Sequence, residues 1–114
     1  FLEAENKILG FNHTDIGCKV AEHWKLPGSL QEIISFHHSP KRAESYSMEV
    51  AIVHVANTFA RVREIGFGGD PLIPVIDETA WDLVNLTDTK LKELLREVQE
   101  LVSNDVLFNE LDLW

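Results

Sequence analysis

Four histidines in the first half of the chain are the residues best suited to chemistry: His13, His37, His38 and His54. Neutral imidazole is the commonest protein ligand for transition metals. Three of them, His13, His37 and His38, are candidate metal ligands, because converging helices could aim them into one pocket. No histidine of the chain is followed by aspartate, and the place where a carboxylate would complete such a site carries Asn57. The combination points to a metal-hydrolase scaffold that has lost its chemistry.

A polar stripe interrupts the most hydrophobic segment of the chain. His54, Asn57 and Arg61 are spaced i, i+3 and i+7, so they share one face of a helix. Buried polar groups are costly unless they are paired, so this stripe must meet partners, and the other histidines are the natural candidates. Spacing alone favours a polar pocket and a purely structural hydrogen-bond network about equally. Gly17 would let the helix beside His13 approach a neighbour closely.

Each candidate also has a structural interpretation. A histidine pair at a helix end is favoured by the helix dipole even without a metal, and for a bare pair this is the better interpretation. A polar residue just ahead of a helix, such as His13, is more often a cap or a satisfied buried group than a ligand. We expect Cys18 to be a buried structural thiol, since it has no second cysteine and no partnering base. Trp24 and Trp81 fall at apolar helix positions, and we expect both in the core.

Hydrophobic periodicity is helical along the chain, with no strand pattern and no internal repeat. Turn and cap residues divide it, since Gly10 closes a first helix, Pro27 opens the third, and Asp77 and Thr87 cap the last two. The helices are expected at residues 2–9, 14–24, 27–38, 48–65, 78–84 and 88–102. The pattern predicts an all-α bundle of about six helices in a single domain, residues 1–114.

Residues 48–65 are apolar on nearly every side, so we expect a central helix that is buried all round. Residues 39–47 are polar and are expected to form a loop. Residues 66–74 are rich in glycine and proline and are also expected to form a loop, but they match no phosphate-binding loop. Residues 105–114 alternate acids with large apolar groups, which fits either a frayed helix end or a docking segment.

Composition restricts the classes of function. The 114 residues are enough for one domain with its own core. Nineteen acidic against ten basic residues give a net charge of −9, which repels phosphate backbones and anionic lipids, so we expect no nucleic-acid and no membrane partner. The single cysteine suits a reducing compartment, and no segment resembles a signal peptide or a membrane span. We expect a cytoplasmic location, and we interpret the start at Phe1 as that of an excised or truncated piece.

Four stretches of the chain carry a family resemblance. They are Gly10-Phe-Asn-His13-Thr-Asp-Ile-Gly17, Ala21-Glu-His-Trp24-Lys-Leu-Pro27, Ile33-Ile-Ser-Phe-His37-His38-Ser-Pro40 and Ala51-Ile-Val-His-Val-Ala-Asn57. With the loop Gly66 to Gly69 and the helix start at Thr87, they resemble the HDOD domain, a helical bacterial signalling module related to the HD and HD-GYP phosphohydrolases. The resemblance spans nearly the whole chain but only the later part of the family's domain. We therefore expect the family's earlier helices, including the segment of the hydrolases' His-Asp dyad, to be absent.

The resemblance implies roles for individual positions. In HD-GYP enzymes the positions matching His13, His37 and His38 are metal ligands, and the position matching Asn57 is an aspartate. This sequence keeps three of these four residues and lacks the dyad. HDOD domains as a class are regarded as non-catalytic regulatory or interaction modules, and the departures agree with that role.

We therefore expect an HD-superfamily-like helical module for signal transduction, with a degenerate metal site and no catalytic residue. Its vestigial metal ligands would be His13, His37 and His38, and its polar pocket would comprise His54, Asn57 and Arg61. The expected partners are other signalling domains or proteins, or a second copy in a homodimer. No cofactor is expected unless the site is functional, in which case it would be a divalent metal (Mn, Fe, Mg or Zn).

Two alternatives of other classes stay open. The first is a metal-dependent phosphohydrolase acting on a phosphodiester or nucleotide, in which the metal generates hydroxide at neutral pH. The second is a helical dimerisation domain whose polar stripe is only structural. We expect no phosphohydrolase turnover, at most weak metal occupancy, and an exposed apolar surface where the absent helices would pack.

Overall fold

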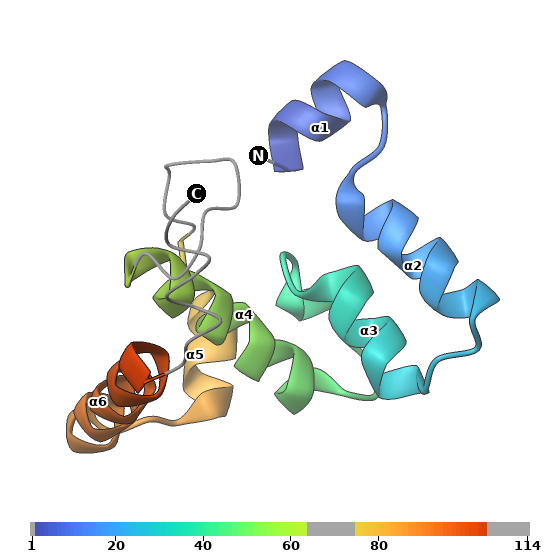
Figure 1. The fold of residues 1–114 in the computed structure, drawn as a ribbon. Helices are drawn as coiled ribbons and strands as arrows, with labels where there is room; N and C mark the ends of the chain where they lie inside the picture. Colours follow the sequence, from blue (N-terminus) through green and yellow to red (C-terminus); the bar gives the residue numbers. More distant parts are fainter. Residues whose placement is uncertain (1, 64–74, 105–114) are drawn as a thin grey trace. The chain divides into compact units, whose positions relative to one another are not determined.

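The computed structural model describes residues 2–63 and 75–104, and it is built from helices (Figure 1). The chain divides into two compact units, Phe1–Val84 and Asn85–Trp114. The elements are α1 (Leu2–Leu9), α2 (His13–His23), α3 (Gly28–Phe36), the 3₁₀ helix η1 (Pro40–Arg42), α4 (Ser47–Val62) and α5 (Glu78–Val84) in the first unit, and α6 (Asp88–Asn104) in the second. Six α-helices and no strand among the described residues confirm the all-α prediction. The expectation of one domain over residues 1–114 stays a prediction.

The helix boundaries follow from local signals. Gly10 ends α1 with a φ of 78°, in the left-handed region that glycine adopts at little cost. The side chain of Asn12 accepts hydrogen bonds from the first turn of α2, and the Asp15 carboxylate accepts one from the Asn12 backbone, which forms a capping box. The expected caps at Asp77 and Thr87 are confirmed, since Asp77 accepts from the Ala80 N–H and Thr87 accepts from the Lys90 N–H.

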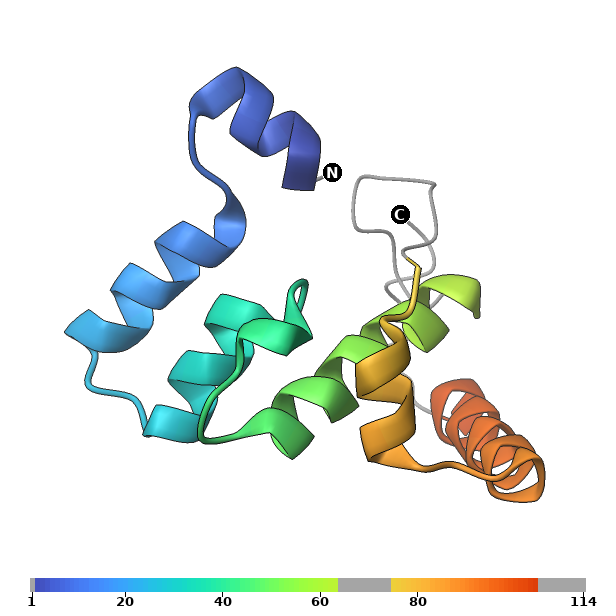
Figure 2. The same cartoon turned by 180° about the vertical axis from the view of Figure 1, so that it is seen from behind.

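The first unit is held together by two helix contacts, α2 on α3 and α4 on α5, with α3 and η1 packing against α4. Figure 1 and its reverse view in Figure 2 both show α2 beside α3. Gly17 makes the close approach possible, because a Cβ there would lie 2.7 Å from Cγ2 of Ile34. The buried apolar core consists of small residues, most of which lie on α4: Ala21, Val50, Ala51, Val55 and Ala80.

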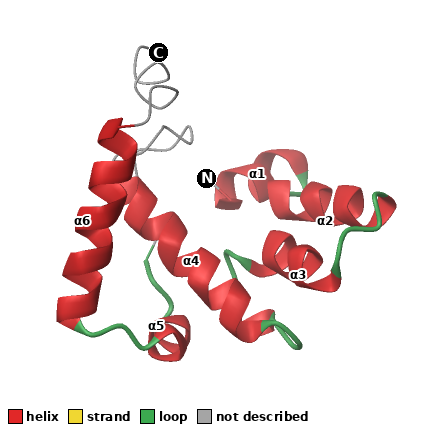
Figure 3. Ribbon diagram, turned by 60° about the horizontal axis from the view of Figure 1, so that its bottom comes forward, coloured by secondary structure: helices red, strands yellow, loops and turns green. Residues whose placement is uncertain are grey.

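The expectation that residues 48–65 are buried on every side is wrong. One face of α4 is buried, whereas Ile52 is 49% exposed and Val62 is 50% exposed. Figure 3 shows α4 running between α3 and α5, and both of these helices pack against it. The apolar sequence of α4 specifies which residues can be buried but not how many neighbours cover them.

Three further expectations need correction. Trp24, expected in the core, is 68% exposed at the end of α2, whereas Trp81 is partly buried with its ring 6.2 Å from that of Phe59. Residues 39–47 are not simply a loop, because Pro40–Arg42 form η1, which begins at a proline. The expected loop at residues 66–74 and the segment 105–114 lie outside the described residues. No helix of the described part is long and apolar enough to cross a membrane.

Candidate functional site

The structure brings three of the candidate residues together where the start of α2 lies beside the end of α3. His13 is the first residue of α2, His37 is the C-cap of α3, and His38 follows it. One ring nitrogen from each lies within 4.8 Å of the others. The ring centroids are 4.2 Å apart for His37 and His38, 4.9 Å for His13 and His38, and 5.8 Å for His13 and His37. We call these residues the three-histidine cluster.

Glu5 of α1 fixes the ring of His13. Its Oε2 accepts a hydrogen bond of 3.0 Å from the backbone N–H of His13 and one of 2.8 Å from Nδ1. The first of these is the main cause that lowers the pKa of Glu5, so this carboxylate is ionised and accepts only. Nδ1 of His13 therefore donates to this carboxylate, and Nε2 is the ring nitrogen that faces away from it. That Nε2 lies 3.0 Å from Nε2 of His38.

The ring of His37 is fixed by the end of its own helix. Nδ1 lies 2.9 Å from the carbonyl oxygen of Ile33 and 3.1 Å from that of Ile34, and because a carbonyl only accepts, Nδ1 must donate. These carbonyls belong to the last turn of α3, where helical partners run out. Nε2 of His37 is therefore the ring nitrogen that these bonds leave unused, as in His13. The cap interpretation proposed for His13 applies instead to Asn12, which precedes it.

His38 is held in its neutral form. Burial lowers its pKa from 6.5 to about 4. The positive charge that His37, His13 or His54 carries when protonated acts in the same direction, whereas Glu5 opposes it. At pH 7 the imidazole of His38 therefore has a lone pair to offer.

His54 is placed differently from the cluster. It is 6% exposed on α4, its Nδ1 donates to the carbonyl oxygen of His37 at 2.7 Å, and its Nε2 accepts from the N–H of Asp77 at 3.0 Å. Both ring nitrogens are thus used, so His54 supports the cluster through the backbone of His37 and has no free ligand atom. Asn57 and Arg61 lie further along α4 and are partly buried, and their role in a polar pocket stays a prediction.

Two features of the site were not expected from the sequence. Glu5 lies eight residues before His13, across the Gly10 turn, and no spacing rule links positions separated by such a turn. Cys18 is partly exposed rather than buried, and its thiol donates to Oε1 of Glu22 at 3.4 Å, which is the i, i+4 neighbour on the same helix.

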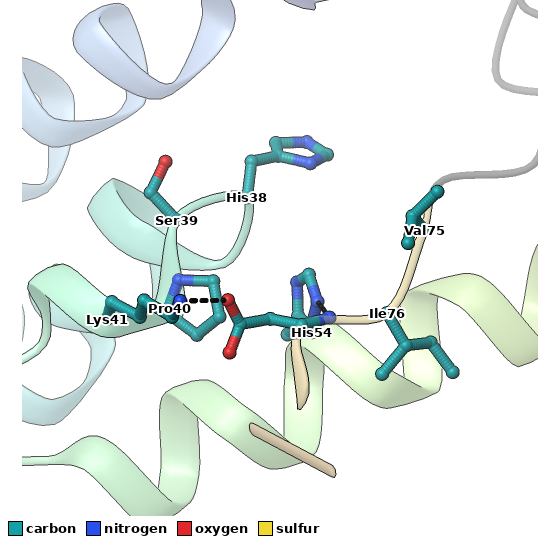
Figure 4. Close-up of a pocket in the computed structure, with 8 residues that line it drawn as sticks. His38, Ser39, Pro40, Lys41, His54, Val75 and Ile76 are labelled. Atoms are coloured by element: carbon teal, nitrogen blue, oxygen red, sulfur yellow. Dashed lines mark hydrogen bonds and ion pairs between the residues drawn. The ribbon is translucent and has the colours of Figure 1, made fainter. Parts of the chain in front are cut away.

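Two cavities adjoin the cluster, and His38 lines both. The first, of about 390 Å³, is shown in Figure 4, with Ser39, Pro40 and Lys41 on one side and Val75 and Ile76 on the other. The second, of about 370 Å³, is walled by α1, α2 and the end of α3. A ligand bound at the cluster would therefore have space on either side.

The donor set fits one metal ion better than two. Zinc held tetrahedrally by nitrogens at about 2.0–2.1 Å requires nitrogen–nitrogen separations of roughly 3.3 Å, and the three nitrogens lie at or within about 1.5 Å of that spacing. In the part of the chain that the structure describes, no aspartate or glutamate oxygen joins the group. Carboxylates that could balance the charge of a second ion are therefore lacking in the described cluster.

Comparison with known proteins gives one match. The family model of the HDOD domain matches residues 1–40, a segment that contains α1 to α3 and all three cluster histidines. No curated protein and no solved structure matches the chain. The resemblance to the HDOD domain is thus confirmed for residues 1–40, over which the chain is similar to that family.

Proposed function

We propose that the chain is a non-catalytic signal-transduction module of HDOD type, which regulates or binds other signalling proteins. The match of residues 1–40 to the HDOD model supports the signalling class. The observation that carries the non-catalytic part is the composition of the three-histidine cluster, which contains imidazoles and no carboxylate ligand among the described residues.

The physical reason lies in charge. A two-metal phosphohydrolase centre holds its ions roughly 3.5–4 Å apart and uses them to clamp the attacking and leaving oxygens. Two dications at that distance repel each other, and carboxylates that bridge them offset the repulsion. Glu5 carries a charge but is engaged with His13 through both of its bonds, and Asn57 offers one neutral oxygen where related enzymes have an aspartate.

Exposed apolar side chains support an interaction role. On α2, Ile16 is 52% exposed and Trp24 is 68% exposed, and on α1, Ile8 is 80% exposed. Large apolar side chains exposed in this way are available for protein–protein contacts. The partners would be other signalling domains or proteins, or a second copy of the chain.

The test is a turnover assay on a generic aryl phosphodiester with added Mn²⁺, Mg²⁺ or Fe²⁺, together with metal analysis of the purified protein. We expect no metal-dependent hydrolysis and fewer than two ions per chain. His37→Ala serves as the site variant and His23→Ala, at an exposed position on α2, as its control. Two tightly bound ions with turnover that His37→Ala abolishes and His23→Ala preserves would overturn the proposal in favour of a metal-dependent phosphohydrolase.

A further inference from the structure

We propose that Glu5 couples the docking of α1 to the occupancy of the three-histidine cluster by a single divalent transition-metal ion. A metal at these three positions is what the resemblance to HD-GYP enzymes already implies, and the new element is the role of Glu5. The inference deepens the proposed function, because it gives the module a ligand and a helix that responds to it. It rests on the donor geometry of the cluster and on how α1 is attached.

The first step concerns the ligand atoms. Backbone carbonyls hold Nδ1 of His37 and the Glu5 carboxylate holds Nδ1 of His13, so each ring directs Nε2 away from its support. Metal-binding histidines are oriented in this way, with the second nitrogen donating to a carboxylate or a carbonyl. Nε2 of His38 already lies 3.0 Å from Nε2 of His13. In the absence of an ion, these two nitrogens can share only one proton between them. An ion placed between them would bind both nitrogens.

The second step concerns the identity of the ion. Three neutral imidazoles are borderline ligands that suit zinc, cobalt, nickel or copper and suit magnesium or calcium poorly. Three protein ligands leave a fourth position of a tetrahedral ion open. The side chain of His13 is 42% exposed, so the ion can enter and leave, as reversible binding requires.

The third step concerns α1. No residue of α1 is buried, and Ile8 and Leu9 point to solvent at 80% and 57% exposure. The helix is joined to α2 by polar contacts, which are the two bonds of Glu5 to His13 and the bond from Asn12 Nδ2 to Asn6 Oδ1 at 3.0 Å. Its docking therefore depends strongly on the strength of the Glu5–His13 pair.

The coupling follows from the chemistry of imidazole. An ion on Nε2 draws electron density from the ring, so the Nδ1–H becomes a stronger donor and its bond to Glu5 tightens. Coupling between two binding events is reciprocal. If the ion strengthens the hydrogen bond between His13 and Glu5, then that hydrogen bond must raise the affinity of the cluster for the ion by the same factor. Since α1 forms one wall of the 370 Å³ cavity, its docking also controls that side of the cluster.

The test combines zinc titration by calorimetry with hydrogen exchange measured on peptides from α1. The wild-type chain should bind one Zn²⁺, His37→Ala should lose that binding, and Mg²⁺ should have no effect. Glu5→Gln, which keeps shape but removes the charge, should weaken zinc binding about 10- to 100-fold. Glu3→Gln, at an exposed position on the same helix, should not. Saturating Zn²⁺ should slow exchange in α1 of the wild-type chain and much less in Glu5→Gln, with circular dichroism used to check that each variant is folded.

The wild-type measurement decides the matter even if a variant fails to fold. Zinc binding without slower exchange in α1 would overturn the coupling, and the absence of zinc binding would overturn the site. Equal weakening by Glu5→Gln and Glu3→Gln would also contradict the role of Glu5. None of these results would affect the proposed function, which fails only if metal-dependent hydrolysis is found.

Discussion

Replacing His54 by phenylalanine tests whether this buried ring joins the end of α3 to the start of α5. The substitution keeps a planar ring but removes the bond from Nδ1 to the carbonyl of His37 and the bond from the Asp77 N–H to Nε2. A buried polar group left without a partner costs about 1–3 kcal/mol. Both partners here are partly buried, so we take about 1–2 kcal/mol for each and expect His54→Phe to lower the free energy of unfolding by about 2–4 kcal/mol.

Two milder variants separate the two bonds. The amide of asparagine can take the place of Nδ1, and that of glutamine can take the place of Nε2, so His54→Asn and His54→Gln should each lose about half as much. His23→Phe, at an exposed position on α2, is the control. Urea unfolding followed by circular dichroism gives the free energies. If His54→Phe lies within about 0.5 kcal/mol of the wild type, the typical range for surface substitutions, then His54 does not hold these elements together.

Two further predictions concern the surroundings of the cluster. The pKa of His38 is about 4 in the folded chain against 6.5 for the free side chain. In metal-free protein, the contribution of the neutral His38 ring to the free energy of unfolding is therefore complete above pH 6.5 and is lost as the pH falls toward 4. Between pH 7 and 5 this loss would be about 2 kcal/mol and about 1 kcal/mol once solvent screening of the partly exposed ring is included. Urea unfolding at both pH values should show the loss. If the free energy of unfolding of His38→Gln depends on pH as that of the wild type does, the assignment to His38 is contradicted. Gly17→Ala places a Cβ 2.7 Å from Cγ2 of Ile34, and about 1–3 kcal/mol of overpacking should outweigh the roughly 1 kcal/mol gained in helix propensity. Ile34→Leu removes that Cγ2, so a double-mutant cycle should show favourable coupling, and strict additivity would refute the clash.

The helices and their caps were predictable because their signals are local. Asp77 and Thr87 accept hydrogen bonds from N–H groups only three residues away. Because donor and acceptor are so close in the chain, a cap residue directly before an apolar helical pattern is enough to predict the bond. The convergence of His13 with His37 and His38 was open to prediction for a related reason. Gly17 indicated a close helix approach, and the structure places it against Ile34 of α3.

Coverage of apolar faces was not predictable in the same way. Helical spacing puts Val20, Ala21 and Trp24 near one face of α2, yet Ala21 is buried and Trp24 is 68% exposed. Periodicity states which side chains point the same way, whereas burial depends on how far the neighbouring helix extends. The exposed apolar surface agrees with the expectation of such a surface, but the packing of further helices on it stays a prediction.

The partners of the polar residues were the hardest to predict, for two distinct reasons. His54 had to meet partners because it is buried, but the partners are the backbone groups of His37 and Asp77, and backbone groups are the same at every position of a sequence. Glu5 is a side chain, yet its link to His13 exists only because the turn at Gly10 brings α1 back toward α2. Tertiary structure therefore determines which nitrogen of each imidazole is held by a hydrogen bond and which one is left free. Residue types alone identified the candidate ligands, and the orientation that makes them suitable for an ion required the fold.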